Sequence, residues 1–421
     1  MSGHHPPVTD WVNDFDHTDA GWAADPFPIW SDIRNGGCPV GRSERYGGVW
    51  LPTRHDDVAA IAYDTEHFTS RSVIVNNGRP LGLQEGGFAP PITSDPPFHH
   101  EARRLLLPAF APKAIAPLEE FTRTYCHQLI DSMLADGTLA NSTLADHAGG
   151  AVTVDAAVDY AQHIPVRVIA EMLGFPAEDS EKFRAFIHVV LEGVNLPFEE
   201  RLTRMGPLLE YLAAQVEDHE LNPRDDLTTY LMNATMDGEP LDGFHILGSI
   251  GLLLVAGIDT TWSAIGASLW HLAKTPTDRH RLATEPELLP SAVEEFLRAY
   301  APVTMARLVK DDFEFNGCPM KADDWVLLSF PAANRDPEAF DNPDDVVIDR
   351  EANRHSAFGL GIHRCVGSNL ARMEMQVAIE VWMDRLGADF ELADPAAVTW
   401  SGGQVRGPRL LPMRVGTGTQ D

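Results

Sequence analysis

The feature that most constrains this chain is a glycine-rich segment around its last cysteine, Phe358-Gly-Leu-Gly-Ile-His-Arg-Cys-Val-Gly367. The three glycines allow the backbone to bend close to the sulfur of Cys365, so that main-chain amides can donate hydrogen bonds to it. The sequence after Cys365 has helical periodicity as far as Leu386 and predicts a helix over residues 365–386. The free amides and the dipole of a helix N-terminus favour an anion, so the segment predicts a thiolate that can bind a metal.

An isolated cysteine is most often a small buried core residue, and that is the alternative for Cys365. The flanking pattern, Phe-Gly-x-Gly-x-His-x-Cys-x-Gly, instead resembles the haem-binding signature of the cytochrome P450 family. The resemblance implies that Cys365 is the axial ligand of haem b, because a thiolate pushes electron density towards the iron and favours O–O cleavage. It also implies that Phe358, Gly359 and Gly367 contribute to haem binding, with Phe358 shielding the sulfur.

A second segment, Ala256-Gly-Ile-Asp-Thr-Thr261, resembles the oxygen-activation motif of the same family and lies in a long apolar helix predicted over residues 241–274. The small side chain of Ala256 lets such a helix lie against a haem face. If the Thr260 hydroxyl disturbs the helical hydrogen bonds, the helix opens locally and admits dioxygen or water. The resemblance implies that Asp259 and Thr260 deliver protons. The alternative is an Asp-Thr pair on a solvated helix face.

Glu295-Phe-Leu-Arg298 resembles the family's Glu-x-x-Arg pair, within a helix predicted over residues 291–300. Residues at i and i+3 share one helix face, so an ion pair between Glu295 and Arg298 is sterically easy. The family uses this pair to hold the segment before the cysteine, which implies a structural role. Arg350 is our candidate for a third partner.

Four further side chains form a predicted anion site. Asp95-Pro-Pro-Phe-His-His-Glu-Ala-Arg-Arg104 resembles a family helix whose basic residues bind the haem propionates, which implies His99 and Arg103. The same resemblance adds His363, two residues before the cysteine, and Arg307, in the strand after the Glu-x-x-Arg helix. Charge-assisted hydrogen bonds from these groups to two carboxylates would be strong.

The resemblance also outlines a substrate pocket, and its members are nearly all apolar. No Lys or Arg is evidently directed into it, so a lipophilic substrate is expected, such as a terpenoid, an aromatic compound or a secondary-metabolite intermediate. The pocket residues are Phe88, Ile92, Val255, Val303, Thr304 and Met305, with Ala256 between pocket and haem.

Composition limits the possible partners. The 421 residues carry 32 Lys and Arg against 62 Asp and Glu, a formal charge of −30, which disfavours nucleic acids and anionic membranes. The four cysteines form no CxxC pair, which favours a reducing compartment. The N-terminus lacks a signal-peptide pattern, and the most apolar run, residues 250–258, falls short of the about 20 residues that cross a bilayer. We therefore expect a cytoplasmic monomer without a membrane anchor.

The pattern of elements predicts a mainly α fold with a smaller β region, arranged as one domain over residues 1–421. Strands are expected at residues 48–51, 305–309, 313–315 and 325–330, with Asn316-Gly317 as a hairpin turn. Residues 76–97 are expected to form a long loop, and residues 334–350 to be irregular. The resemblance implies the cytochrome P450 fold, with the haem between the long central helix and the cysteine-ligand helix.

The implied activity is a monooxygenase reaction, in which one atom of dioxygen enters the substrate and the other leaves as water. The chain has no flavin or iron–sulfur segment, so electrons must come from a ferredoxin or flavodoxin served by an NAD(P)H-dependent reductase. Arg103, Arg364 and Arg372 are the candidate docking cations, and reversing the charge of Arg372 is expected to slow electron transfer. The alternatives are a peroxide-driven peroxygenase or isomerase, against which Asp259 and Thr260 argue, and a non-catalytic haem sensor or carrier.

Overall fold

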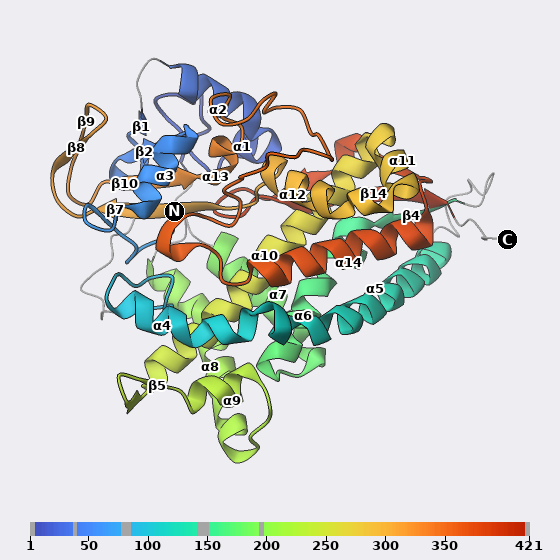
Figure 1. Cartoon of the computed structure of the whole chain (residues 1–421), viewed down its shortest axis with the longest axis horizontal. Helices are drawn as coiled ribbons and strands as arrows, with labels where there is room; N and C mark the ends of the chain where they lie inside the picture. Colours follow the sequence, from blue (N-terminus) through green and yellow to red (C-terminus); the bar gives the residue numbers. More distant parts are fainter. Residues whose placement is uncertain (1–4, 37–39, 77–85, 141–150, 193–197, 417–421) are drawn as a thin grey trace.

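A computed structural model describes residues 5–36, 40–76, 86–140, 151–192 and 198–416. Helices form most of the fold; the largest sheet lies at the left of Figure 1, and strands β4 (Ala151–Asp155) and β14 (Pro412–Gly416) lie on the opposite side. The mainly α prediction is therefore confirmed. The helices are α1 (Ala20–Ala24), α2 (Pro26–Asn35), α3 (His55–Tyr63), α4 (Phe98–Leu106), α5 (Pro112–Ala140), α6 (His163–Leu173), α7 (Ser180–Ile187), α8 (Phe198–Leu221), α9 (Leu227–Met232), α10 (Gly243–Lys274), α11 (Pro276–Thr284), α12 (Leu289–Ala299), α13 (Phe330–Ala333) and α14 (Ser368–Leu386).

Helix α10 runs through the centre of the fold and packs against α6 and α14 (Figure 1). It begins at Gly243 because the side chain of Asp242 accepts a hydrogen bond from the His245 amide and caps the first turn. An 18-residue window of α10 has a mean hydropathy of 1.5, so by length and composition the whole helix is able to cross a membrane. The expectation that its apolar run is too short was therefore wrong. Its apolarity has a simpler origin, because a helix enclosed by other helices is apolar on most of its faces.

The largest sheet joins strands from the N-terminal part of the chain with two strands from residues 304–329. Its strand order is β1 (Gly41–Ser43), β2 (Val49–Leu51), β10 (Trp325–Ser329), β7 (Thr304–Val309) and β3 (Phe68–Thr69). Strands β7 and β10 are antiparallel, with Thr304 opposite Ser329 and Leu308 opposite Trp325. Because side chains alternate along a strand, Met305 and Arg307 lie on one face of β7 and Thr304 on the other.

The other strands form smaller sheets. Strands β11 (Phe390–Leu392), β14 (Pro412–Gly416) and β4 (Ala151–Asp155) form a three-stranded sheet. Two-stranded sheets are formed by β5 (Thr235–Met236) with β6 (Glu239–Pro240), by β8 (Phe313–Phe315) with β9 (Cys318–Met320), and by β12 (Thr399–Trp400) with β13 (Pro408–Leu410). The predicted turn between β8 and β9 is confirmed, because Asn316 and Gly317 have φ values of 48° and 79°. Positive φ at both central residues is typical of a type I′ hairpin.

The predicted helix over residues 291–300 is α12, which begins at Leu289, before its first-turn proline, Pro290. Residues 334–350 are irregular, as predicted. Of the long loop predicted over residues 76–97, residues 77–85 lie outside the described part of the chain, and residues 86–97 form turns without a regular element.

Candidate active site

The cysteine segment is a tight loop that rests on the end of α3. Gly359 and Gly361 have φ values of 69° and 68°, a region that side-chain-bearing residues rarely adopt. A Cβ atom at Gly361 would lie 2.2 Å from the carbonyl oxygen of Ala62 in α3. These two glycines are therefore required, one for its backbone conformation and the other also for its close approach to α3.

Cys365 lies in this loop and not in a helix, so the predicted helix over residues 365–386 was wrong at its start. The Cys365 amide donates to the Phe358 carbonyl at 2.7 Å, which closes the loop back on itself. Val366 and Gly367 then form a turn, and α14 starts at Ser368. The predicted amide donor is present nevertheless, because the Gly367 amide hydrogen-bonds the Cys365 sulfur.

The surroundings of Cys365 act on its pKa in opposite directions. Burial among protein atoms raises the pKa of the thiol, whereas the Gly367 amide and the guanidinium groups of Arg103, Arg364 and Arg372 lower it. Although protein atoms surround Cys365, its side chain keeps an accessible surface, whereas Cys126 and Cys318 are buried. Among the cysteines in the described ranges, Cys365 alone is therefore open to a ligand, and the reading as a buried core thiol fails.

The centre of α10 also has an accessible surface. Ala256 is exposed and Thr260 is partly exposed, whereas Leu254 and Ile258 beside them are fully buried. The Thr260 hydroxyl donates to the Ala256 carbonyl at 2.9 Å, and the helix is continuous through both residues. The local opening that we expected at this point is thus absent from the described helix. The hydroxyl is instead bonded to the carbonyl one turn back, a bond that often bends helices.

Asp259 points in a different direction from Thr260, because successive residues of a helix are about 100° apart. It is completely buried, and one carboxylate oxygen lies 2.8 Å from the guanidinium of Arg409. Arg409 is in β13, also donates to the Ser263 hydroxyl at 3.2 Å, and lies over the Trp262 ring. The predicted acid is therefore held in an ion pair by the C-terminal region, a partner that the sequence did not indicate.

The four predicted propionate donors come together from three segments of the chain. His99 and Arg103 lie in α4, Arg307 in β7, and His363 in the cysteine loop. The rings of His99 and His363 are 4.3 Å apart between centroids, in an edge-to-face arrangement. The Arg103 side chain donates to the Arg364 carbonyl at 2.5 Å and so reaches the loop that carries the cysteine. We call His99, Arg103, Arg307 and His363 the basic cluster.

In the basic cluster His99 and Arg307 are buried and the other two side chains are partly buried, and one acid, Asp95, acts on His99 and Arg307. Burial lowers the pKa of His99 to about 4 and that of His363 to about 2, with the neighbouring cations acting in the same direction. Burial also lowers the pKa of Arg307 to about 10. Among the described residues, neither ring nitrogen of His99 has a hydrogen-bond partner, and nor does Nε2 of His363. Because buried polar groups are normally bonded, this arrangement fits a ligand that brings acceptor oxygens and negative charge.

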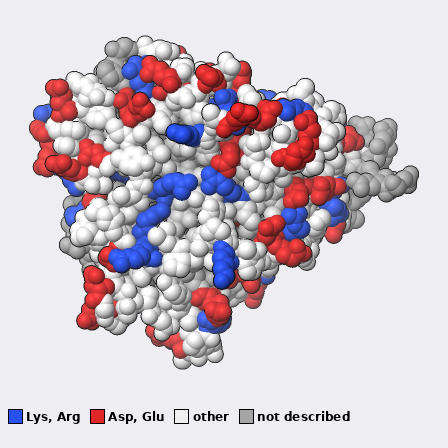
Figure 2. Space-filling view, viewed as in Figure 1, with Lys and Arg blue, Asp and Glu red and all other residues white. Residues whose placement is uncertain are grey.

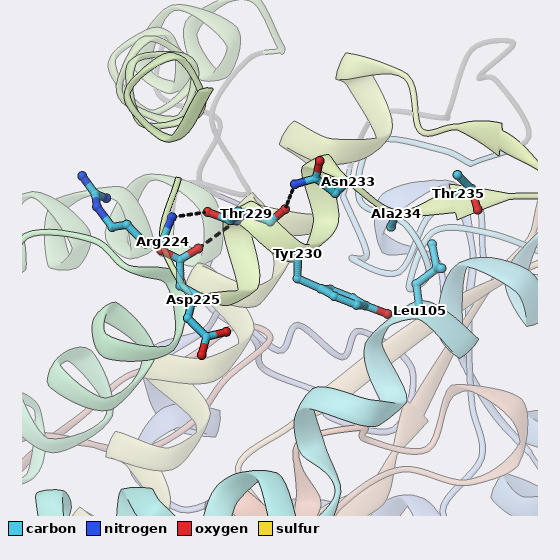
Figure 3. Close-up of a pocket in the computed structure, with 9 residues that line it drawn as sticks. Leu105, Arg224, Asp225, Thr229, Tyr230, Asn233, Ala234 and Thr235 are labelled. Atoms are coloured by element: carbon cyan, nitrogen blue, oxygen red, sulfur yellow. Dashed lines mark hydrogen bonds between the residues drawn. The ribbon is translucent and has the colours of Figure 1, made fainter. Parts of the chain in front are cut away.

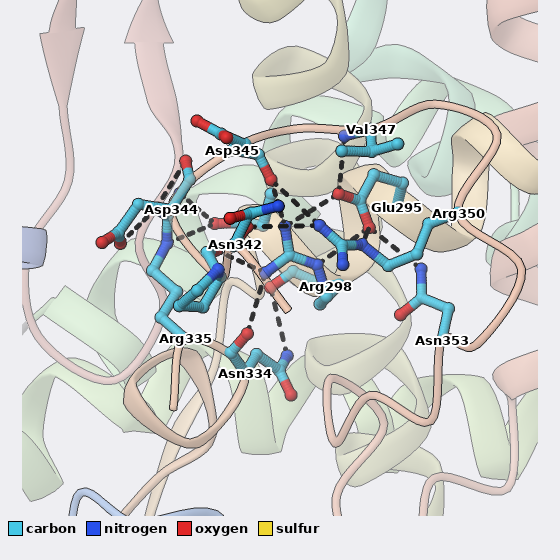
Figure 4. Close-up of polar contacts among 12 residues, drawn as sticks. Glu295, Arg298, Asn334, Arg335, Asn342, Asp344, Asp345, Val347, Arg350 and Asn353 are labelled. Atoms are coloured by element: carbon cyan, nitrogen blue, oxygen red, sulfur yellow. Dashed lines mark hydrogen bonds and ion pairs between the residues drawn. The ribbon is translucent and has the colours of Figure 1, made fainter. Parts of the chain in front are cut away.

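The predicted Glu295–Arg298 pair is buried and bidentate, with both side chains 0% exposed and both N–O distances 2.8 Å (Figure 4). The proposed third partner is present, because Arg350 donates to Glu295 at 3.0 Å. Arg298 also donates to the carbonyls of Asn334, Pro343 and Asp345. The pair thereby fixes the irregular segment that precedes the cysteine loop. We call Glu295, Arg298 and Arg350 the acid–base core.

The predicted pocket residues divide into three sets. Val255, Val303 and Met305 are half-buried, and Met305 accepts a contact at its sulfur from the Gln404 amide at 2.9 Å. Ile92 is half-buried, but Phe88 is 57% exposed beside exposed Phe244, at the surface where α10 begins. Thr304 is buried on the opposite face of β7 from Met305, so the structure separates it from this group.

A groove elsewhere on the molecule contains none of the predicted residues (Figure 3). It has a volume of about 500 Å³ and lies between α9 and the end of α4, where Leu105 and Tyr230 meet. Several of its polar groups bond one another: the Arg224 amide donates to the Thr229 hydroxyl at 3.1 Å, and Asn233 donates to the Thr229 carbonyl at 2.8 Å. These hydrogen bonds within the groove explain why its polar residues are there without a ligand.

The predicted docking cations differ in whether a neighbouring carboxylate compensates their positive charge. Lys and Arg side chains form a band across the middle of the face that carries α4 and the start of α14, whereas Asp and Glu dominate its margins (Figure 2). Arg364, four residues before the start of α14, is exposed. Arg372, however, forms two bonds to Glu294, at 2.5 and 2.9 Å, which compensate its charge.

Comparison with known proteins agrees with this geometry. The cytochrome P450 family model matches residues 208–392. The chain is 33% identical to the mycinamicin IV hydroxylase/epoxidase of Micromonospora griseorubida, over 87% of this chain and 89% of that one. It is 31% identical to the nocardicin C N-oxygenase of Nocardia uniformis, over 92% and 96% of the two chains. The structure of CYP109E1 from Bacillus megaterium in complex with testosterone aligns with a TM-score of 0.82 at 28% identity, covering 94% of this chain and 99% of that one.

The fold, the accessible cysteine and these relatives together define a haem-thiolate monooxygenase. The chain belongs to the cytochrome P450 family. The residues present fit haem, because an amide-bonded sulfur and a basic cluster with unbonded ring nitrogens match an iron and two carboxylates.

Several residues of the site were missed from the sequence. Arg409 and Gln404 come from the C-terminal segment, which carries no motif, and reach the site only through the fold. Glu294 precedes the recognised Glu-x-x-Arg pair by one residue, and its contact with α14 depends on how two helices pack. No sequence motif marks Glu294, which is partly exposed.

Proposed function

We propose that Cys365 binds the haem iron and that the basic cluster holds the two propionates. The observation that carries this proposal is the convergence of an accessible cysteine and four buried or partly buried basic side chains, two of which have ring nitrogens without a hydrogen-bond partner among the described residues. Phe358, Gly359 and Gly367 support the sulfur, and the accessible surface at Ala256 lies against the cofactor. Haem supplies the iron at which dioxygen is activated.

The spectrum of the reduced protein with carbon monoxide tests this proposal. The far-red-displaced Soret band of a thiolate-bound haem is expected in the wild type and should disappear in Cys365→Ala. Cys126→Ala is the control, because burial raises the pKa of that thiol to about 12 and keeps it out of the site. A Cys365→Ala protein with an unaltered spectrum would overturn the assignment.

We further propose that Thr260 and Asp259 deliver protons during oxygen activation. Thr260 offers a partly exposed hydroxyl. Asp259 offers a buried carboxylate that is held in an ion pair with Arg409. Thr260→Ala should keep the consumption of NADH while diverting oxygen to peroxide or water, and Thr260→Ser should restore the product yield per electron. An unchanged yield in Thr260→Ala would rule out this role.

The proposed substrate is a lipophilic small molecule, such as a terpenoid, an aromatic compound or a secondary-metabolite intermediate. Val255, Val303 and Met305 support this, because they offer half-buried apolar surface. Ile92 extends that surface, and Phe88 is placed at the entrance. A screen by haem spectral shift is the direct test, because a ligand that displaces water from the iron changes the Soret band. Shifts with charged compounds and none with lipophilic ones would contradict the proposal.

The proposed electron donor is a ferredoxin or flavodoxin with an NAD(P)H-dependent reductase. It would dock on the face that carries Arg103 and Arg364, because a positive patch on a chain of charge −30 attracts an acidic partner. Arg364→Glu should slow electron transfer most at low ionic strength. Lys321→Glu, at an exposed lysine that follows β9, is the control. Equal rates in both variants at every salt concentration would reject this face.

We also propose that residues 1–421 act as one domain, and that the protein is a cytoplasmic monomer that binds neither nucleic acid nor membrane. The enclosure of α10 by other helices supports the absence of a membrane span. Light scattering of the purified protein tests the monomer.

A further inference from the structure

Arg372 occupies a position that its sequence context did not suggest. It lies in the second turn of α14, and its guanidinium is 4.4 Å from the centroid of the Phe358 ring. Its side chain is 26% exposed, so it lies along the protein and does not extend into solvent. The negative face of an aromatic ring attracts a cation in this arrangement.

The Phe358 ring connects this cation to the cysteine loop. Phe358 accepts the hydrogen bond from the Cys365 amide at 2.7 Å, so the two residues are tied together through the backbone. The positive charge of Arg372 lowers the pKa of the Cys365 thiol, together with Arg103 and Arg364, against the dominant effect of burial. Arg372 is therefore close enough for its charge to act on the sulfur.

Other residues fix the position of Arg372. Glu294 in α12 accepts two hydrogen bonds from it and a third from Nε2 of His355, at 3.0 Å. The Ala357 amide donates to Nδ1 of His355, which leaves Nε2 as the nitrogen that donates. Although burial tends to raise the pKa of Glu294, these bonds lower it to about 2, so the carboxylate stays charged. Arg372 is thus held on one side by Glu294 and on the other by Phe358.

We propose that Arg372, held against Phe358 by Glu294, is a positioning residue that sets the charge balance at Cys365 and so raises the reduction potential of the haem iron. A fixed positive charge near a thiolate favours the ferrous state, which carries one more negative charge than the ferric state. Charges and hydrogen bonds around the ligand are known controls of haem potentials. The inference rests on the proposed ligation by Cys365.

The test is the midpoint potential of the ferric–ferrous couple in the haem-loaded protein. Arg372→Gln should lower the potential, because it removes the cation but keeps a polar side chain of similar reach. Glu294→Gln should raise it, because it removes the opposing charge while leaving a hydrogen-bond acceptor for Arg372. Arg372→Lys should stay close to the wild type. Arg385→Gln is the matched control, because Arg385 lies at the far end of α14 and pairs with Asp131.

Shifts of opposite sign in Arg372→Gln and Glu294→Gln would support the inference, since a purely structural role would move both potentials in the same direction. Unchanged potentials, or shifts of the same sign, would overturn it. A normal potential in Arg372→Gln with an altered salt dependence of electron transfer would also overturn it, in favour of a docking role. The carbon monoxide spectrum of the wild type separates these outcomes from a failure of Cys365 ligation, which would remove the thiolate Soret band in every protein tested.

Discussion

The acid–base core and the basic cluster are both buried groups of charged and polar side chains, but they are completed in different ways. In the acid–base core, Glu295 lies between Arg298 and Arg350, and backbone carbonyls accept the remaining guanidinium hydrogens. In the basic cluster, Asp95 is the one acid that acts on the four basic groups, and ring nitrogens of His99 and His363 are unbonded among the described residues. A buried network in which every donor and charge has a partner within the protein has a structural role. A network that leaves donors unbonded and positive charge in excess is suited to bind an anionic ligand.

The largest effect is expected from breaking the acid–base core. Glu295→Ala leaves two buried guanidinium groups without their carboxylate, which should lower the free energy of unfolding by about 3–5 kcal/mol. Urea unfolding measures this loss. Glu200→Ala is the control: it removes an exposed partner of Arg204, and such pairs contribute under about 1 kcal/mol. If Glu295→Ala unfolds like the wild type, the core does not have the structural role assigned to it.

The same kind of change in the basic cluster should affect haem retention and spare folding. Arg307→Met removes a 5%-exposed guanidinium whose one hydrogen bond among the described residues goes to the Ala306 carbonyl. We expect unfolding of the haem-free chain to need as much free energy as before, or more. Loss of a charge-assisted bond worth about 1.5–3 kcal/mol should speed haem release at least about tenfold.

Transfer of haem to a scavenger protein measures this release, and Arg414→Met, at an exposed position in β14, is the control. The comparison between the two clusters would fail if Arg307→Met destabilised the haem-free chain as strongly as Glu295→Ala while leaving haem release unchanged.

A smaller effect concerns pH. The pKa of His99 is lowered to about 4, mainly by burial. Between pH 6.5 and 4, the unfolded chain takes up a proton that the folded chain does not, so stability falls as the pH falls. For the haem-free chain the loss between pH 7 and 5.5 should be about 1 kcal/mol.

Urea unfolding at pH 7 and 5.5 checks this dependence on pH. His99→Gln should reduce it by the share of one histidine, because the lowered pKa values of His17 and His163 act in the same direction. His280→Gln, at an exposed position in α11, should not reduce it. Bound haem should also reduce the dependence, because carboxylates beside the ring favour its protonated form. If haem left the dependence unchanged, the basic cluster would not be the site of the propionates.

The smallest effect is expected at the edge of the acid–base core. Asn353 donates to Glu295 at 3.1 Å, while its own side-chain oxygen has no partner among the described residues. Asn353→Ala should therefore cost only about 0.5–1 kcal/mol of unfolding free energy, the usual net value of one hydrogen bond. A loss as large as that in Glu295→Ala would mean that the network acts as an indivisible unit.

Local sequence determined the elements and the chemistry of individual residues. Three features depend only on residues that are neighbours in the sequence: the apolar run before Lys274, the turn at Asn316 and the glycines around Cys365. The i, i+3 spacing of Glu295 and Arg298 likewise fixes their contact within one helix. The motif around Cys365 identified the ligand even though α14 begins later than predicted, because the amide of Gly367 reaches the sulfur from a turn.

Only the tertiary structure decided which distant residues meet. Asp259 pairs with Arg409 across 150 positions, and Glu294 meets Arg372 across 78, because helices and strands from separate parts of the chain pack together. It also showed that β7 begins at Thr304, so that Thr304 and Met305 lie on opposite faces because side chains alternate along a strand. Burial and charge compensation depend on all the atoms around a side chain, so they cannot be predicted from a short stretch of sequence. For that reason the sequence named the basic cluster and the acid–base core alike, and only the fold showed that the second is complete and the first is not.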